Sequence, residues 1–317
     1  MGAILVTGAA GFIGGHVVEL LVARGEHVVG LDNFDPYYSP EIKRRTAARL
    51  TRHGNFALHE MDIRQAELVR GLVREQGVDR IIHLAALAGV RASIERAAEY
   101  HEVNVGGTIR LLDAAREAGV SQFVLASTSS VYGASTRVPF VESDAADRPL
   151  APYPASKRAA ELMAYAYNNL FGVSVTCVRL FTVYGPRVRP DMMLYLVADA
   201  ALRGGQVTMF DGGEMRRDWT YVGDIAAGII AALDRPSGFE IMNLGRGEPV
   251  ILSDFVRRIE QLAGAPARIV RLPAPPSEPP ITFADIGKAR RLLGYEPRVS
   301  VAEGLELFWE WFARDQR

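Results

Sequence analysis

The stretch AILVTGAAGFIG at residues 3–14 decides the fold predicted for this chain. Its first five residues form an apolar strand, and the apolar positions after Gly14 have the spacing of a helix. A glycine turn between a strand and a helix leaves backbone N–H groups and the positive end of the helix dipole free to bind a pyrophosphate. The glycines are spaced Gly-x-x-Gly-x-x-Gly, which differs from the Gly-x-Gly-x-x-Gly of the usual dinucleotide fingerprint. The glycine spacing alone therefore does not establish a dinucleotide-binding site, and the residues that follow must supply further evidence for it.

Support comes from a second apolar strand at residues 27–31, which ends at Asp32. An acidic residue at this distance accepts hydrogen bonds from the adenosine ribose hydroxyls of a dinucleotide. Its negative charge would repel a 2′-phosphate, so the two features together favour NAD over NADP. The alternative, an ordinary glycine turn followed by a solvated aspartate, stays open at this point.

Strands and helices continue to alternate up to residue 180. The expected strands lie at residues 55–59, 80–84, 122–126 and 173–180, and the expected helices at residues 65–76, 104–118 and 155–170. This alternation predicts an α/β fold with a doubly wound parallel, or Rossmann, sheet. Ligands of such sheets bind just beyond the carboxyl ends of the strands, and the candidates there are Asp62, Ile63, Leu84, Ala85 and Ala86. His83, inside an apolar strand, is predicted to be a hydrogen-bonded core residue.

The alternation loosens after residue 180, where glycines and prolines interrupt it. We therefore predict an NAD-binding domain at residues 1–180 and a smaller α+β substrate-binding domain at residues 181–317. A segment near residues 220–245 is expected to return to the large sheet, and residues 301–312 are expected to form a terminal helix. Four arginines of the second domain lie in predicted loops, where guanidinium groups either are solvated or hold a diphosphate bidentately: Arg187, Arg189, Arg216 and Arg217.

Composition narrows the class of partner. Lys plus Arg number 36 and Asp plus Glu number 37, for a formal net charge of -1, so no basic excess indicates nucleic acid or an anionic membrane surface. A small-molecule partner is expected. The single cysteine, Cys177, excludes an internal disulfide and favours a cytoplasmic location. We expect no signal peptide, because the apolar N-terminus has no basic region before it and is interrupted by glycines. We expect no membrane-spanning helix, because no apolar run reaches roughly 20 residues.

The sequence Tyr153-Pro154-Ala155-Ser156-Lys157 predicts a catalytic base. A helix that starts near Pro154 places Tyr153 and Lys157 on one side, about one turn apart. An adjacent ammonium favours the phenolate and so lowers a phenol pKa that is otherwise about 10. The alternative is an ordinary helix face, since this spacing also arises by chance. Upstream, the hydroxyl cluster Ser127-Thr128-Ser129-Ser130 follows an apolar strand and offers a hydroxyl for a hydrogen bond.

With these pieces in place, the chain resembles the extended short-chain dehydrogenases/reductases over nearly its full length, and within them the nucleotide-sugar 4-epimerases. The resemblance rests on TGAAGFIG at residues 7–14, LDN at 31–33, DI at 62–63, NVGGT at 104–108 and the Tyr153-x-x-x-Lys157 pair. Four further stretches look most like the UDP-glucuronate 4-epimerases: DNFDPYY at 32–38, LFTVYGP at 180–186, RPDM at 189–192 and RDWTYV at 217–222.

The resemblance implies a set of site residues. The catalytic residues would be Thr128, Tyr153 and Lys157. NAD would be bound by Gly8, Gly11, Phe12, Ile13, Gly14, Asp32, Asn33, Asp62, Ile63, Leu84, Ala85, Ala86, Asn104, Tyr153 and Lys157. The UDP-sugar would be bound by Thr128, Ser129, Ser130, Thr182, Arg187, Asp191, Met192, Thr208, Phe210, Arg217 and Glu278. The resemblance implies that no metal ion is bound and that the protein forms a homodimer.

The implied reaction is NAD-dependent inversion of C4 of a UDP-hexuronate through a 4-keto intermediate. Related dehydratases and decarboxylases carry carboxylates where this chain has Ser129 and Ser130, so elimination and decarboxylation lack their expected residues. Two departures from the family stand out: Pro275 replaces a customary uridine-diphosphate contact, and Gly223 stands where an aspartate is common. The alternatives are a UDP-glucose/UDP-galactose 4-epimerase, a net NAD-dependent oxidoreductase and a non-catalytic binding module.

Overall fold

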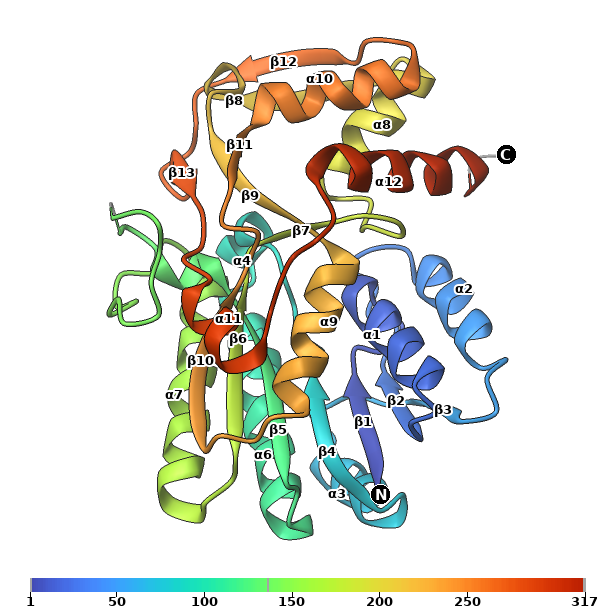
Figure 1. The fold of residues 1–317 in the computed structure, drawn as a ribbon, viewed down its shortest axis with the longest axis vertical. Helices are drawn as coiled ribbons and strands as arrows, with labels where there is room; N and C mark the ends of the chain where they lie inside the picture. The colour runs from blue at the N-terminus through green and yellow to red at the C-terminus, as the bar shows by residue number, and fades with distance from the viewer. Residues whose placement is uncertain (1, 136, 316–317) are drawn as a thin grey trace.

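The computed structural model describes residues 2–135 and 137–315, and its centre is a parallel sheet of seven strands among these residues (Figure 1). The strand order is β10-β6-β5-β4-β1-β2-β3. The strands are β1 (Ala3–Thr7), β2 (Val28–Asp32), β3 (Phe56–Glu60), β4 (Val78–His83), β5 (Gln122–Thr128), β6 (Val175–Leu180) and β10 (Phe239–Leu244). Every residue of β1, β2, β5 and β6 is buried, as expected when both faces of a sheet are covered.

Helices cover both faces of this sheet, which confirms the doubly wound fold. On one face α1 (Phe12–Ala23) and α9 (Val222–Leu233) bury Val17, Leu21 and Ile229 against it. The other face carries α3 (Ala66–Glu75), α6 (Gly107–Ala118) and α7 (Pro152–Phe171). The remaining helices around the sheet are α2 (Pro40–Leu50), α4 (Val90–Glu95), α5 (Ala97–His101) and α11 (Gly287–Leu293).

Two helices begin where the sequence did not place them. The helix expected at residues 104–118 is α6, Gly107–Ala118, and is preceded by a π-helical turn, Glu102–Gly106. The Thr108 hydroxyl bonds the Asn104 carbonyl oxygen of that turn at 2.6 Å. The helix expected from residue 155 starts at Pro152, where the proline occupies the first turn. Tyr153 therefore belongs to the first turn of α7.

The smaller region lies above the carboxyl ends of the large sheet (Figure 1). Its strands are β7 (Thr182–Tyr184), β8 (Gln206–Phe210), β9 (Arg216–Tyr221), β11 (Pro249–Ile251), β12 (Arg268–Leu272) and β13 (Ile281–Thr282). Its helices are α8 (Met193–Arg203), α10 (Leu252–Ala263) and α12 (Val301–Asp315). Their shared core is aromatic: Trp219 stacks on Phe255 with ring centroids 3.8 Å apart, and Phe308 stacks on Phe312. No described helix is both long and apolar enough to cross a bilayer.

The two regions are joined through the chain and through a buried carboxylate. Segment 239–244, predicted to return to the large sheet, is β10 and pairs with β6. The Asp218 carboxylate on β9 accepts backbone N–H groups from Arg246, Gly247 and Ala284 at 2.7, 2.9 and 3.1 Å. It thereby fixes the loops after β10 and β13 to the strand that carries Arg217.

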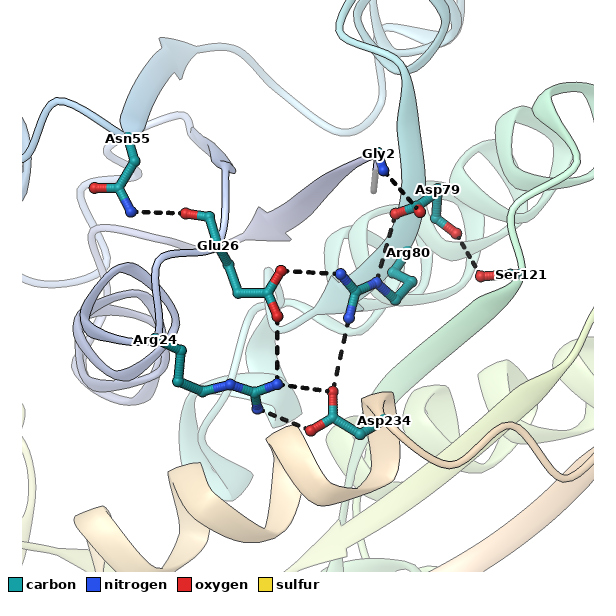
Figure 2. A network of polar contacts seen from close by, with 8 residues as sticks. All are labelled: Gly2, Arg24, Glu26, Asn55, Asp79, Arg80, Ser121 and Asp234. Atoms are coloured by element: carbon teal, nitrogen blue, oxygen red, sulfur yellow. Dashed lines mark hydrogen bonds and ion pairs between the residues drawn. The ribbon is translucent and has the colours of Figure 1, made fainter.

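An ion-pair network lies at the amino-terminal ends of the strands of the large sheet (Figure 2). Arg80 on β4 bonds Glu26 at 3.0 Å, and Arg24 after α1 bonds Asp234 after α9 at 2.8 Å. These pairs tie the ends of α1 and α9 to the sheet. Ligands of such sheets bind beyond the carboxyl ends of the strands, so the candidate site is expected on the opposite side from this network.

Candidate active site

A cavity of about 500 Å³ opens at the carboxyl edge, between the large sheet and the smaller region. It runs from the glycine turn to the catalytic candidates on α7 and β5 and ends against β7. Most of the predicted residues line it: Gly8, Gly11, Phe12, Ile13, Gly14, Asp32, Asn33, Ile63, Leu84, Ala85, Ala86, Thr128, Ser129, Ser130, Tyr153, Lys157, Thr182, Met192 and Glu278. The sequence therefore predicted side chains that the fold brings to one cavity.

The glycine turn has no room for side chains at two of its glycines. Gly8 has φ +70°, and a Cβ there would lie 2.9 Å from the Ala85 nitrogen. A Cβ on Gly14 would lie 2.0 Å from the Gly8 carbonyl oxygen. Since no side chain caps the first N–H groups of α1 at Phe12, the turn presents backbone donors to the cavity. The turn fits the pyrophosphate of a dinucleotide.

The Asp32 carboxylate stands at the end of β2 beside this turn. It accepts the Ala10 N–H at 3.1 Å and the Phe34 N–H at 2.9 Å, and only 5% of the residue is exposed. Burial raises the pKa of the carboxyl, while the charge of Lys43 opposes that rise. The carboxylate is thus fixed in orientation at the cavity wall, in the position predicted for the ribose hydroxyls.

Replacing Asp32 with alanine is expected to weaken NAD binding about tenfold or more, because a hydrogen bond to a charged group contributes roughly 1.5–3 kcal/mol. NADP binding should fall less, since the variant also loses the repulsion of the 2′-phosphate. Titration of the apoprotein with both dinucleotides measures the two effects. Asp32→Asn, which keeps the size and part of the hydrogen bonding, is the control. Equal losses for NAD and NADP would contradict the assignment.

Two predicted cofactor residues, Asp62 and Asn104, lie behind the cavity wall and do not line the cavity. Asp62 accepts hydrogen bonds from Arg64 at 2.8 Å and Asn33 at 3.0 Å, and its neighbour Ile63 lines the cavity. The buried Asn104 amide bonds both the N–H and the carbonyl of Leu87, at 2.9 and 3.0 Å. Both hold cavity-lining segments in place, so direct NAD contacts by Asp62 and Asn104 stay predictions.

Tyr153 and Lys157 lie together on the first turns of α7, and both line the cavity. Burial raises the pKa of the Tyr153 phenol, while a hydrogen bond with the Thr128 hydroxyl and the positive charge of Arg189 lower it. Burial also lowers the pKa of Lys157 to about 8, against the pull of the Glu161 carboxylate. Thr128 and Arg189 thus favour the phenolate, and the predicted effect of Lys157 on it stays a prediction.

The predicted sugar-side residues divide into three groups. Ser129, Ser130, Thr182 and Glu278 line both the main cavity and an adjoining cavity of about 100 Å³, which Arg217 also lines. Thr128 and Met192 line the main cavity alone. The other four, Arg187, Asp191, Thr208 and Phe210, line neither cavity. Arg187 is turned toward Glu19 by its positive φ of 65°, and Asp191 pairs with Arg189 at 2.9 Å. Thr208 and Phe210 lie on β8, where the Arg91 guanidinium covers the Phe210 ring at 4.5 Å.

Sequence reasoning missed several lining residues. Arg189 was singled out as a loop arginine and in the RPDM stretch but not among the site residues, yet it lines the cavity and acts on Tyr153. Tyr37 and Tyr38 also line it, and the signal for them was the DNFDPYY stretch at residues 32–38. Among the described residues no group of three His, Cys, Asp or Glu side chains is placed to hold a metal ion.

A buried ion pair lies directly behind the catalytic candidates. Glu161, one turn after Lys157, accepts two bonds from Arg179 at 2.9 and 2.8 Å and one from the Ser127 hydroxyl at 2.5 Å. Glu161 and Arg179 are 0% and 1% exposed, and Arg179 lies over the Tyr132 ring at 4.7 Å. The pair joins α7 to β5 and β6 at the strand end that carries Thr128.

The sheet and this cavity together define the class of protein. It is a Rossmann-type protein whose cavity has a glycine turn suited to a dinucleotide at one end, serine and threonine hydroxyls at the other, and Tyr153 between them. The chain belongs to the NAD dependent epimerase/dehydratase family, whose sequence pattern matches residues 4–245.

Individual relatives cover nearly the whole chain. A UDP-glucuronate 4-epimerase of Thermodesulfobacterium geofontis is 40% identical, over 98% of this chain and 96% of that protein. The structure of UDP-glucuronic acid 4-epimerase from Bacillus cereus, in complex with UDP-glucuronic acid and NAD, superposes with a TM-score of 0.92 at 35% identity and covers 98% of this chain and 99% of that one. A UDP-glucose 4-epimerase of Thermotoga maritima with UDP-glucose gives 0.91 at 30% identity, covering 99% and 100%.

Proposed function

We propose that this protein is an NAD-dependent 4-epimerase that interconverts UDP-glucuronate and UDP-galacturonate. The observation that carries the proposal is the single cavity that joins the glycine turn and Asp32 to Tyr153 and then to Ser129, Ser130 and Thr182. The UDP-glucuronate 4-epimerases among its relatives support the choice of substrate.

In this mechanism the Tyr153 oxygen takes the proton of the sugar 4-hydroxyl and later returns it to the opposite epimer. The Thr128 hydroxyl bonds the same oxygen and orients the phenolate toward C4. The glycine turn and Asp32 would hold NAD, which would supply a reversible acceptor for the C4 hydride, so that no net oxidation of the sugar would occur. Lys157 closes the cavity beside Tyr153, in position to hold the nicotinamide ribose.

The hydroxyls at the far end of the cavity suit a carboxylate. Ser129, Ser130 and Thr182 offer three O–H donors, and charge-assisted hydrogen bonds are about twice as strong as neutral ones. Arg217 and Glu278, paired at 3.1 Å beside the smaller cavity, are proposed to hold the nucleotide. Arg187, Asp191, Thr208 and Phe210 stay weaker candidates, because they lie outside the lining of both cavities.

Thr182→Val is expected to lower kcat/KM for UDP-glucuronate about tenfold, and to affect UDP-glucose less. Valine keeps the shape of the side chain but removes one donor to a charged group, which contributes roughly 1.5–3 kcal/mol against about 1 for a neutral partner. Thr182→Ser, which keeps the hydroxyl, should retain the preference. Wild-type preference for UDP-glucose, or equal losses on both sugars in Thr182→Val, would contradict the carboxylate assignment.

We further propose a cytoplasmic homodimer with a substrate-binding domain at residues 181–317. The outer face of α7 supports the dimer, since it leaves Leu162, Tyr165, Leu170 and Phe171 48–68% exposed. The reduced, buried Cys177 is consistent with the cytoplasm. The mass of the protein in solution, measured by light scattering, tests the dimer.

A further inference from the structure

A run of buried hydrogen bonds begins at the glycine turn and crosses the sheet through a histidine. The Thr7 hydroxyl, which immediately precedes the turn, lies 2.7 Å from His83 Nδ1 and also accepts the Ala85 N–H at 3.1 Å. His83 Nε2 lies 3.0 Å from the Thr108 hydroxyl, which bonds the Asn104 carbonyl oxygen at 2.6 Å. Every side chain in this part of the run is at most 1% exposed.

The run continues to the catalytic helix. The Asn104 amide nitrogen donates to the Ser156 hydroxyl at 2.9 Å, and that hydroxyl donates to the Tyr153 carbonyl oxygen at 2.8 Å. The same amide holds both backbone groups of Leu87. The run therefore links the glycine turn, both ends of the cavity-lining segment 84–87, and the backbone of the proposed base.

One assignment of protons satisfies every contact around His83. Since the Thr108 hydroxyl donates to a carbonyl, its oxygen must accept from His83, so Nε2 carries the proton. Nδ1 is then an acceptor and receives the Thr7 hydroxyl proton, which leaves the Thr7 oxygen free for the Ala85 N–H. The opposite tautomer would leave Nε2 facing an oxygen with no proton to give.

The surroundings keep the ring neutral. Burial lowers the pKa of His83 well below its ordinary value, and the positive charge of Lys157 lowers it further. A second proton on the ring would also lose the bond from Thr7. Phe123 packs against the ring edge-to-face, with centroids 6.0 Å apart, which fixes its plane.

We propose that His83 is a positioning residue, whose neutral Nε2–H tautomer braces the cofactor turn against the Asn104 turn and, through Ser156, against Tyr153. The brace is mechanical and carries no proton between the two ends, because it passes through the Asn104 amide and ends on a backbone carbonyl. It holds the wall formed by residues 84–87 in register with the base. The inference rests on the proposed function for its catalytic consequence, but its structural content is independent of the substrate.

Nitrogen-15 NMR of the histidine-labelled holoenzyme tests the tautomer directly. We expect the His83 signals to show the neutral Nε2–H form and not to titrate between about pH 5.5 and 8.5. The exposed His53, on a surface turn, supplies a reference signal in the same spectra. A His83 ring that carries its proton on Nδ1, or that titrates near its ordinary pKa, overturns the proposal.

Variants test the bracing. His83→Phe keeps the ring and loses both bonds, and we expect it to release NAD at least roughly tenfold faster and to lower kcat while KM for the UDP-sugar stays within about twofold. His53→Asn is the control. Unchanged NAD release from folded His83→Phe, or a change confined to KM, would contradict the brace.

A double-mutant cycle tests the coupling between the two ends of the run and leaves His83 itself unsubstituted. Thr7→Val and Ser156→Ala are expected to be non-additive in their effects on NAD release, although they lie on different elements. Additive effects would refute the coupling. The NMR and NAD-release measurements need no UDP-sugar, so failure of the protein to convert UDP-glucuronate would refute the proposed function and leave these two tests intact.

Discussion

Tyr153→Phe is expected to fold, to bind NAD and to lose turnover by ~10²–10⁴-fold, the usual cost of removing a general base. The phenylalanine ring keeps the edge-to-face contact with Tyr100, whose ring centroid lies 6.2 Å away. Only the oxygen that bonds Thr128 and takes the C4 hydroxyl proton is lost. Initial rates with UDP-glucuronate, together with the NAD content of the purified variant, measure the effect.

Tyr165→Phe is the matched control, because Tyr165 lies on the same helix and is 54% exposed. It should retain the wild-type rate. A Tyr153→Phe variant with a rate near the wild type would exclude Tyr153 as the base. A variant that has also lost NAD would indicate that the hydroxyl acts in cofactor binding.

Arg179→Met is expected to destabilise the fold by about 3–5 kcal/mol, because it leaves the Glu161 carboxylate buried with its main partner gone. Arg179 donates two of the bonds that Glu161 accepts, and only Ser127 and Arg158 would remain. Since Ser127 precedes Thr128, the activity of the remaining folded protein should also fall. Urea unfolding followed by fluorescence measures the free energy.

The double variant Glu161→Gln/Arg179→Met separates the charge from the packing. Removing both charges is expected to recover a large part of the lost stability, since an uncompensated buried ion costs more than a missing pair. A loss below about 1 kcal/mol in the single variant would show that the carboxylate is solvated or protonated there. Additive losses in the double variant would show that the two side chains do not act as a pair.

The parts of the fold and site that could be predicted from the sequence are those that depend on local sequence patterns. The glycine turn, Asp32 and the Tyr153-Lys157 spacing each depend on a strand end or one helical turn, and the fold brings them together because parallel strands end at one edge. The His83 prediction is confirmed, since a polar residue inside a buried strand must find partners.

Long-range contacts account for what the sequence could not predict. Arg187 and Arg189 are two positions apart in one loop, yet Arg187 has a positive φ and pairs with Glu19, whereas Arg189 lines the cavity. The expectation that Lys157 lowers the Tyr153 pKa followed from their spacing. It stays a prediction, and the contributions of Thr128 and Arg189, which lower the pKa of the phenol against the effect of burial, depend on long-range contacts.

The central claim is tested most directly by incubating the holoenzyme with UDP-glucuronate that carries deuterium at C4 and following the products by NMR. The account predicts a mixture of UDP-glucuronate and UDP-galacturonate, with deuterium retained at C4 and no NADH accumulating. Stoichiometric NADH would instead show a net oxidoreductase. A pentose product, or no change in the uronate while UDP-glucose is converted, would contradict the assignment of the substrate.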